Sequence, residues 1–416
     1  MARVVISGYY GFRNTGDEAI LRSILHALER LGHVEAVVLS GDPALTRLEH
    51  GVEAIQRTNL VAIIRALWGS DALVSGGGSL LQDATGALSI PYYLGVILLA
   101  RVLGKPVVVY GQGVGPVSNP FYRFLIRVVL DRVETITVRD QGSAAFLREL
   151  GVRCPPVEVT ADAVFSLPLP AGRHGPVRGG LEPGGEGRQE IGPEGEPAAG
   201  SQAGQGTEPE EEKGLKLQNG DGEGDGTGDW DATASRVVIG VALRSWEVEF
   251  EDRLAAALNI LTDRFKARIV FLPMQLPGDR EVSQRVREQM KEPGRLVTLD
   301  SGAGTPERVL EALAGIDLLV GMRLHALIFA AIVGVPMVGL CYDPKVTAFL
   351  QTLGLPGAVA LDGFEPEELV ERVVQTWENR KALVRSMESG VRGMRRRAEG
   401  NNRALERVLG RGGGLG

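Results

Sequence analysis

Short runs of aliphatic and β-branched residues alternate with helical patterns along the whole chain. In the first 170 residues the runs cover 3–7, 36–39, 72–75, 107–110 and 135–138, and from residue 236 on they cover 237–243, 268–272, 318–320 and 336–340. Nearly continuous apolar strands separated by helices are typical of parallel sheets covered on both faces. The pattern predicts an α/β protein with two doubly wound Rossmann-like domains, residues 1–170 and 236–416, facing each other across a cleft.

The first predicted helix, residues 17–31, has clear local signals. Thr15 and Glu18 have the T-x-x-E spacing of a capping box, and Gly32 provides a stop. Apolar residues recur on one face at Ile20, Ile24, Leu28 and Leu31. This face is expected to pack on a sheet.

The segment 171–235 differs in composition from both flanking parts. It holds 14 Asp and Glu against 5 Lys and Arg, a net charge of −9 within a chain total of −7, and 18 of the 56 glycines. Trp230 is its only aromatic residue. So little apolar surface cannot offset the entropy of ordering the chain, which predicts a disordered linker; a docking segment is the alternative.

Composition narrows the class of protein. Apolar residues make up 44% and charged residues 23% of the 416 residues, and the two cysteines cannot form a disulfide framework, so a reducing cytoplasm is expected. The amino terminus lacks the pattern of a secretory leader. Pro91 and Arg101 interrupt the most apolar stretch, 87–103, so no membrane-spanning segment is expected. Without a basic stripe interleaved with aromatic residues, nucleic acid is not an expected partner.

Glycine-rich segments follow several predicted strands at their carboxyl ends, where open α/β sheets bind ligands. Gly8–Gly16 leads into the first helix, and three consecutive glycines, Gly76, Gly77 and Gly78, follow the strand at 72–75. Such turns let backbone N–H groups approach an anion or a sugar, although tight turns alone would also use glycine. Neither G-x-G-x-x-G nor a Walker lysine is present.

Four cationic side chains follow four different strands: Arg139, Arg323, His325 and Lys345. Together they would suit a small anion with carboxylate or phosphate groups, and His325 could also transfer a proton. Taken singly, each is equally explained as a surface ion pair or a structural histidine. The other histidines (His26, His33, His50 and His174) have no metal-ligand partner at suitable spacing, so no metal site is expected.

Three carboxylates lie at the predicted strand or helix ends: Asp17, Asp83 and Asp162. Each could hold sugar hydroxyls or cap a helix. Cys154 and Cys341 have no dedicated base nearby and are expected to be inert.

As a set, these segments resemble the polysaccharide pyruvyl transferases, and among them the bacterial CsaB type. The segments that carry the resemblance are 8–19 (GYYGFRNTGDEA), 75–83 (SGGGSLLQD), 111–116 (GQGVGP), 138–140 (VRD), 162–165 (DAVF), 240–246 (GVALRSW), 273–275 (PMQ) and 321–325 (GMRLH). The resemblance covers both predicted domains but not the segment 171–235.

The resemblance implies a fold like that of the GT-B glycosyltransferases, and transfer of the pyruvyl group of phosphoenolpyruvate to a sugar as a cyclic ketal. For the CsaB type, the implied acceptor is the 4,6-diol of an N-acetylmannosamine unit in a lipid-linked precursor of secondary cell-wall polysaccharide, a polymer that S-layer proteins bind. The implied donor-binding positions are Arg139, His325 and Lys345, with Arg323 as a further anion ligand. Other substrate-binding positions are expected at Asn14, Asp17, Gly77, Gly78, Gln112, Arg244 and Gln275, with Asp17 a candidate base. No cofactor is implied.

Two other readings remain open from sequence. The same fold could serve a nucleotide-sugar glycosyltransferase of the cell envelope, or a non-catalytic sugar-phosphate binding protein. A lipid-linked acceptor would also bring the protein to the inner face of the membrane, where residues 392–397, with three consecutive arginines, could contact anionic lipid. A solvated helix face explains that run equally.

Overall fold

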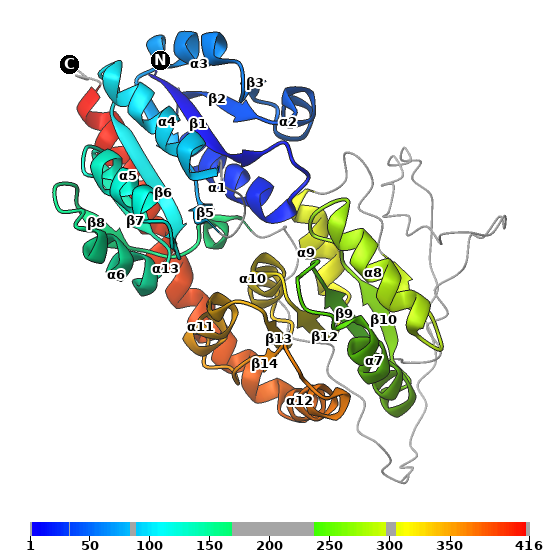
Figure 1. Ribbon diagram of the computed structural model, residues 1–416. Coiled ribbons are helices and arrows are strands. Elements are labelled where there is room, and N and C mark those ends of the chain that lie inside the picture. The colour runs from blue at the N-terminus through cyan, green and yellow to red at the C-terminus, as the bar shows by residue number, and fades with distance from the viewer. Residues whose placement is uncertain (1, 33, 84–88, 169–236, 297–304, 413–416) are drawn as a thin grey trace, which may run out of the picture.

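The computed structural model describes residues 2–32, 34–83, 89–168, 237–296 and 305–412. Segment 171–235, with His174 and Trp230, lies outside the described residues, and so does His33. Within them the chain forms two parallel sheets, each covered by helices on both faces (Figure 1). This confirms the predicted fold class.

The first sheet has eight strands in the order β3-β2-β1-β4-β6-β7-β8, with β5 pairing with β6. Its strands are β1 (Ala2–Tyr10), β2 (Val34–Ser40), β3 (Glu53–Gln56), β4 (Ala72–Ser75), β5 (Gly78–Leu81), β6 (Val107–Val114), β7 (Thr135–Val138) and β8 (Val157–Val159). The helices are α1 (Thr15–Leu31), α2 (Pro43–His50), α3 (Leu60–Trp68), α4 (Ser89–Val102), α5 (Pro120–Leu130), α6 (Gln141–Leu150) and the 3-10 turn η1 (Ala163–Ser166).

The second sheet has six strands in the order β11-β10-β9-β12-β13-β14. They are β9 (Val238–Ala242), β10 (Arg268–Phe271), β11 (Arg295–Leu296), β12 (Leu318–Gly321), β13 (Met337–Cys341) and β14 (Val359–Ala360). The helices are α7 (Glu251–Phe265), α8 (Gly278–Gln289), α9 (Pro306–Ala314), α10 (Leu324–Val333), α11 (Pro344–Thr352), α12 (Pro366–Glu378) and α13 (Arg380–Gly412). The short strands β3, β5, β8, β11 and β14 were not predicted, because these segments lack the nearly continuous apolar run that marks the other strands.

The start of α1 corrects the predicted capping box. Asn14, not Thr15, caps the helix, and its side chain accepts the Gly16 N–H at 3.2 Å. Glu18 turns back to accept the Gly11 N–H at 2.8 Å, and not the N–H of the cap residue as it would in a capping box. Thr15 instead donates its N–H to the carbonyl of Met274 in the second half of the chain. Gly32 ends the helix as predicted.

Helix α13 returns the chain to the first sheet (Figure 1). Asn401 donates to the carbonyl of Ala161 at 3.0 Å and accepts the Thr160 hydroxyl at 2.6 Å, while Asn402 accepts the Tyr110 hydroxyl. These amides are buried, so their hydrogen bonds fix the helix in register. The division at residues 236–416 did not anticipate this return.

The apolar faces of α1, α9, α10 and α13 share one buried cluster that joins the two sheets. Ile20 and Leu28 of α1 belong to the same cluster as Leu313 of α9 and Leu327 of α10. Arg22–Glu307 and Arg30–Glu399 ion pairs, at 3.5 and 3.2 Å, lie at its margin. The predicted apolar face of the first helix therefore packs on the second half as well as on its own sheet.

Candidate active site

The carboxyl ends of β1 and β10 are tied together by backbone contacts. Thr15 N–H donates to the Met274 carbonyl at 2.9 Å, Leu276 N–H donates to Arg13 at 3.3 Å, and Asn14 and Gln275 form an antiparallel bridge. Two of the predicted substrate-binding residues, Asn14 and Gln275, thus sit opposite each other. The edges of the two sheets, where α/β folds bind ligands, meet at this point.

His325 and Arg139 converge on one carboxylate, that of Asp162. His325 Nε2 lies 3.7 Å and Arg139 Nη1 lies 3.2 Å from Asp162 Oδ2. The Asp162 side chain is 5% exposed, and its interactions with His325 and Arg139 and the Val164 N–H overcome burial and lower its pKa to about 2. An ionised carboxylate therefore lies between the Arg139 guanidinium and the His325 imidazole, which follow strands of different sheets. The predicted capping role is confirmed, because Asp162 Oδ1 accepts the Val164 N–H at 3.2 Å and caps the turn η1. The pairing of Asp162 with Arg139 and His325 was not predicted.

Arg139 is held in place by its neighbours on the first sheet. Its Nη2 donates to Ser79 Oγ at 2.8 Å, beside Gly78 and the start of β5. Gly113 of β6 leaves room for the guanidinium, because a Cβ there would lie 2.8 Å from Nε. The side chain is 8% exposed, so its orientation is fixed before any ligand binds.

Asp17 follows Gly16, which packs on the His325 imidazole, and it faces Gly78. Gly78 has a φ of +86°, which favours glycine, and a Cβ there would lie 2.8 Å from Asp17 Oδ1. Burial raises the pKa of Asp17, and the charges of Glu18 and Asp162 raise it as well, while His325 and Arg323 oppose the rise. The resulting pKa is about 7. A carboxyl group with a pKa near 7 is suited to take or give a proton.

Arg323 does not point with His325, although the two were expected to enter the site together. As the N-cap residue of α10 it turns to Asp279, with Nε 2.9 Å from Oδ2, and Nη2 donates to Gln275 at 3.1 Å. The Asp279 Oδ2 atom also accepts the N–H groups of Met274 and Gln275. Arg323 therefore braces the 274–276 loop against Asn14 and Thr15. Asp279 was not predicted, because it lies on α8 outside the motif 273–275 and its partner Arg323 is 44 residues away along the chain.

Arg244 and Lys345 belong to a second group of side chains around Tyr342. The Arg244 guanidinium packs against both the Trp246 and the Tyr342 ring, at 4.9 and 4.8 Å from their centroids, and donates to the Tyr342 hydroxyl at 3.2 Å. The two rings also contact each other edge-on, with their centroids 4.7 Å apart. Lys345 Nζ lies 2.8 Å from Asp343 Oδ2. The pKa of Asp343 is lowered, against burial, by Lys345 and also by Arg139, so the field of Arg139 reaches this group.

The remaining predicted residues have structural contacts. Gln112 is fully buried and donates to the Gly76 carbonyl at 3.1 Å, while its Oε1 has no hydrogen-bond partner among the described residues. Gly77 packs on Ile20, where a Cβ would come within 3.1 Å of that side chain. Asp83 accepts the N–H groups of Ser118 and Asn119 rather than facing the site.

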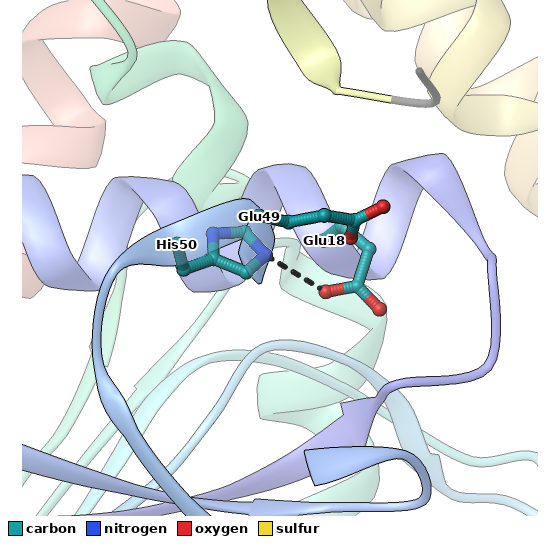
Figure 2. Close-up of side chains that lie close together, drawn as sticks. All are labelled: Glu18, Glu49 and His50. Carbon is teal, nitrogen blue, oxygen red and sulfur yellow. Dashed lines mark hydrogen bonds and ion pairs between the residues drawn. The ribbon is translucent and has the colours of Figure 1, made fainter. Parts of the chain in front are cut away.

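His50 corrects another expectation, since it ends α2 and lies beside two carboxylates (Figure 2). Its Nε2 and Glu18 Oε2 are 3.0 Å apart, and one ligand atom from each of Glu18, Glu49 and His50 lies within 4.8 Å of the others. Burial and the charge of Glu18 raise the pKa of Glu49. Both Glu18 oxygens are already engaged, one by His50 and one by Gly11, so the cluster secures the glycine-rich loop to α2.

The fold and the meeting of two sheet edges define a class, the proteins with two α/β domains of the GT-B type. Similar solved structures include a UDP-N-acetylglucosamine 2-epimerase assigned from Listeria monocytogenes, at 12% identity, TM-score 0.61, and 98% and 97% coverage of the two chains. Another similar structure is that of the Anabaena protein HepE in complex with UDP-glucose, at 11% identity, TM-score 0.55, and 99% and 100% coverage of the two chains. A third is a Rickettsia africae glycosyltransferase, at 10% identity, TM-score 0.58, and 98% coverage of each chain. At such identities the likeness concerns the fold alone.

The sequence itself places the chain within this class. The family model for polysaccharide pyruvyl transferase matches residues 14–344, and the chain belongs to that family. No curated protein matches the chain significantly. The match begins at Asn14 and ends at Pro344, so it includes both sides of the site. In the described residues, no helix is long and apolar enough to cross a membrane.

Proposed function

We propose that this protein transfers the pyruvyl group of phosphoenolpyruvate to two hydroxyls of a sugar, forming a cyclic ketal and releasing phosphate. One observation carries the proposal within the family: Arg139 and His325, from opposite sheets, meet at the buried and ionised Asp162. A donor with a carboxylate and a phosphate needs several fixed cations at close range. Arg139 and Lys345 hold these two groups. The donor either displaces the carboxylates of Asp162 and Asp343 from the two cations or shares the cations with them.

The chemistry requires two proton transfers. The methylene carbon of the donor accepts a proton and becomes the methyl group, while positive charge develops at the central carbon. One sugar hydroxyl adds to that carbon, the bond to the phosphate oxygen breaks, and the second hydroxyl closes the ring. Of the two hydroxyl protons, one balances the new methyl hydrogen and the other leaves on phosphate. Neither a redox change nor a resident cofactor is required.

The side chains divide these tasks by position. His325, whose Nε2 lies beside Asp162, assists phosphate departure or delivers the proton to the methylene. Asp17, with its pKa raised to about 7, accepts a proton from a sugar hydroxyl when it is ionised. Gly77, Gly78 and Asn14 lie in the loops around it and orient the sugar. Arg323 and Gln275 hold the two edges together.

For the acceptor we propose the 4,6-diol of an N-acetylmannosamine unit in a lipid-linked precursor of secondary cell-wall polysaccharide, made on the inner side of the cell membrane. The support is the CsaB-type spacing of the segments 8–19, 75–83 and 321–325. Pyruvylated polymers of this kind would serve to anchor S-layer proteins.

The test combines binding with turnover. A ligand that binds only the native state raises the melting temperature, so phosphoenolpyruvate should raise it for the wild type but not for Arg139→Ala or His325→Ala. Phosphate release with a soluble N-acetylmannosaminide should be abolished in His325→Ala, whose far-UV circular dichroism should match the wild type. Lys381→Ala, an exposed change on α13, is the control. A folded, fully active His325→Ala variant would remove this residue from the mechanism.

Nucleotide-sugar transfer is the second candidate, because the similar solved structures include the Anabaena protein HepE in complex with UDP-glucose. The aromatic rings around Arg244 offer a surface on which a base could stack. A melting-temperature shift with a uridine nucleotide sugar and none with phosphoenolpyruvate would favour this candidate. Binding of phosphoenolpyruvate without turnover of any sugar would instead indicate a sugar-phosphate binding protein.

A further inference from the structure

Helices α3, α4 and α5 cover one face of the first sheet, opposite the face on which α1 and α13 pack. Ile63 of α3, Ile97 of α4 and Ile126 of α5 belong to one buried cluster with the sheet residues Val5 and Val109. By contrast, α1 contributes to the other cluster, which joins the two sheets. The outer side of α3, α4 and α5 is therefore a surface away from the junction between the sheets.

This outer side carries large apolar side chains in solvent. Trp68 is 72% exposed, Val102 75% and Phe121 61%. With them we define the α3–α5 surface as Leu60, Val61, Ile64, Trp68, Leu98, Val102, Phe121 and Phe124. These eight residues account for most of the exposed large apolar side chains that the described part of the chain contains. Grouped exposure of this kind marks a surface that binds something.

The charge on the same helices has one sign. The segments 60–68, 89–102 and 120–130 contain no Asp or Glu and carry Arg65, Arg101, Arg123 and Arg127. Arg65 and Arg127 are exposed, whereas Arg101 and Arg123 pair with Glu134 and Glu149 at 2.9 and 2.5 Å. Exposed aromatic and aliphatic groups beside exposed arginines, on helices that contain no acidic residue of their own, are typical of proteins that lie on anionic bilayers.

We infer that the α3–α5 surface docks on an anionic lipid bilayer, its apolar side chains entering the interface and its arginines contacting lipid phosphates. A two-fold contact between copies would bring the arginines of each copy toward those of the other, which charge repulsion opposes. The bilayer offers the complementary charge. The residues 392–397 fit this role less well, because Arg395 is half-buried on α13, which lowers its pKa.

A series of side-chain contacts leads from the start of α3 toward the first-sheet side of the candidate active site. Arg57, three residues before α3, lies 4.0 Å from the ring centroid of Tyr92 on α4 and 5.2 Å from that of Phe12. Phe12 stacks on Tyr9 at 4.3 Å, and Gln275 hydrogen-bonds to the Tyr9 side chain. A protein docked through these helices would hold the loops around Asn14 close to the bilayer, where a lipid-linked sugar lies.

The experiment is co-sedimentation of the full-length protein with vesicles of phosphatidylcholine alone or with phosphatidylglycerol. The wild type should pellet with the anionic vesicles, and the bound fraction should fall as salt is raised. Trp68→Ser/Phe124→Ser and, separately, Arg65→Glu/Arg127→Glu should each lower the partition coefficient about tenfold. Leu48→Ser, an equally exposed change on α2 (77% exposed), is the matched control and should bind as the wild type.

The proposal is overturned if the wild type does not bind anionic vesicles, or if Trp68→Ser/Phe124→Ser binds as tightly as Leu48→Ser. Sedimentation velocity without lipid completes the test. If the wild type is a dimer and Trp68→Ser/Phe124→Ser is a monomer, the surface is assigned to contact between copies instead. Pyruvyl transfer to a water-soluble acceptor should be equal in all four proteins. A wild type that binds anionic vesicles but does not transfer pyruvyl groups would therefore refute only the proposed reaction. A wild type that transfers pyruvyl groups but does not bind the vesicles would refute only the docking surface.

Discussion

The imidazole of His325 packs directly on Gly16. A Cβ at residue 16 would lie 2.1 Å from His325 Nδ1 and 2.8 Å from its Cβ, so the ring cannot swing aside by a small rotation. Gly16 is in the first turn of α1 and His325 in the first turn of α10, so the contact joins the amino-terminal ends of helices from the two halves. It fixes the imidazole relative to Asp162.

Gly16→Ala should therefore displace His325 and lower the rate of phosphate release by about 100-fold, since small misplacements of a catalytic group have effects of this size. The melting temperature should change little relative to this loss. Gly95→Ala on α4 has open space around the new methyl group and serves as the control, with wild-type activity expected. A Gly16→Ala enzyme with the wild-type rate would show that the contact does not position His325.

Asp17→Asn tests the raised pKa. Because the folded pKa, about 7, exceeds the unfolded value of about 3.8, the native state loses stability as pH rises from about 4 to 7. The asparagine variant should avoid this loss and be more stable than the wild type at pH 8, by roughly 2–4 kcal/mol in urea denaturation.

The same substitution should lower the activity and change its pH dependence. If ionised Asp17 is the base, kcat/KM of the wild type should rise with pH through about 7 and then level, and Asp17→Asn should lack that limb. Asp83→Asn, a carboxylate that holds loop N–H groups, is the control and should keep the pH profile. An unchanged profile in Asp17→Asn would exclude it as the base.

Asp162→Asn tests the opposite shift. Its folded pKa of about 2 lies below the unfolded value, so its charge stabilises the protein above pH 4, and this contribution is lost as pH falls from about 4 to 2. The variant should be less stable at pH 7 by about 2 kcal/mol, a difference that narrows toward pH 3. Urea titrations across this range measure it, and a difference that stays constant with pH would contradict the assignment.

Asp279→Asn should loosen the 274–276 loop, because the buried carboxylate pairs with Arg323 and accepts two loop N–H groups. Removing one charge of a buried pair costs about 3 kcal/mol. The double variant Asp279→Asn/Arg323→Gln should be no less stable than Asp279→Asn, because the two residues act as a pair. Strictly additive losses of stability in the double-mutant cycle would show that the two residues act independently.

The role of Arg323 is tested by the melting-temperature shift with phosphoenolpyruvate. If Arg323→Gln keeps this shift, Arg323 holds the 274–276 loop in place and does not bind the donor.

Several features of the site followed from sequence because they depend on short-range order. The alternation of strands and helices placed Arg139, His325 and Lys345 at the carboxyl ends of strands, and the glycine-rich segments marked the turns that face them. The Asp162 role, the brace from Asp279 and the return of α13 did not follow. The ion-pair partners of Asp162 and Asp279 lie far away along the chain, Arg139 by 23 residues and Arg323 by 44, and no periodicity links them.

The sequence by itself determined the fold class, the family and the cationic residue types at the site, because hydrophobic period and motif spacing are properties of neighbouring residues. Only the tertiary structure decided which of four cations share a carboxylate, since Arg323 and His325 are two residues apart yet turn to Asp279 and Asp162 respectively. It also raised the pKa of Asp17 and lowered that of Asp162. Burial and fixed charges, which depend on contacts between both halves, set these values.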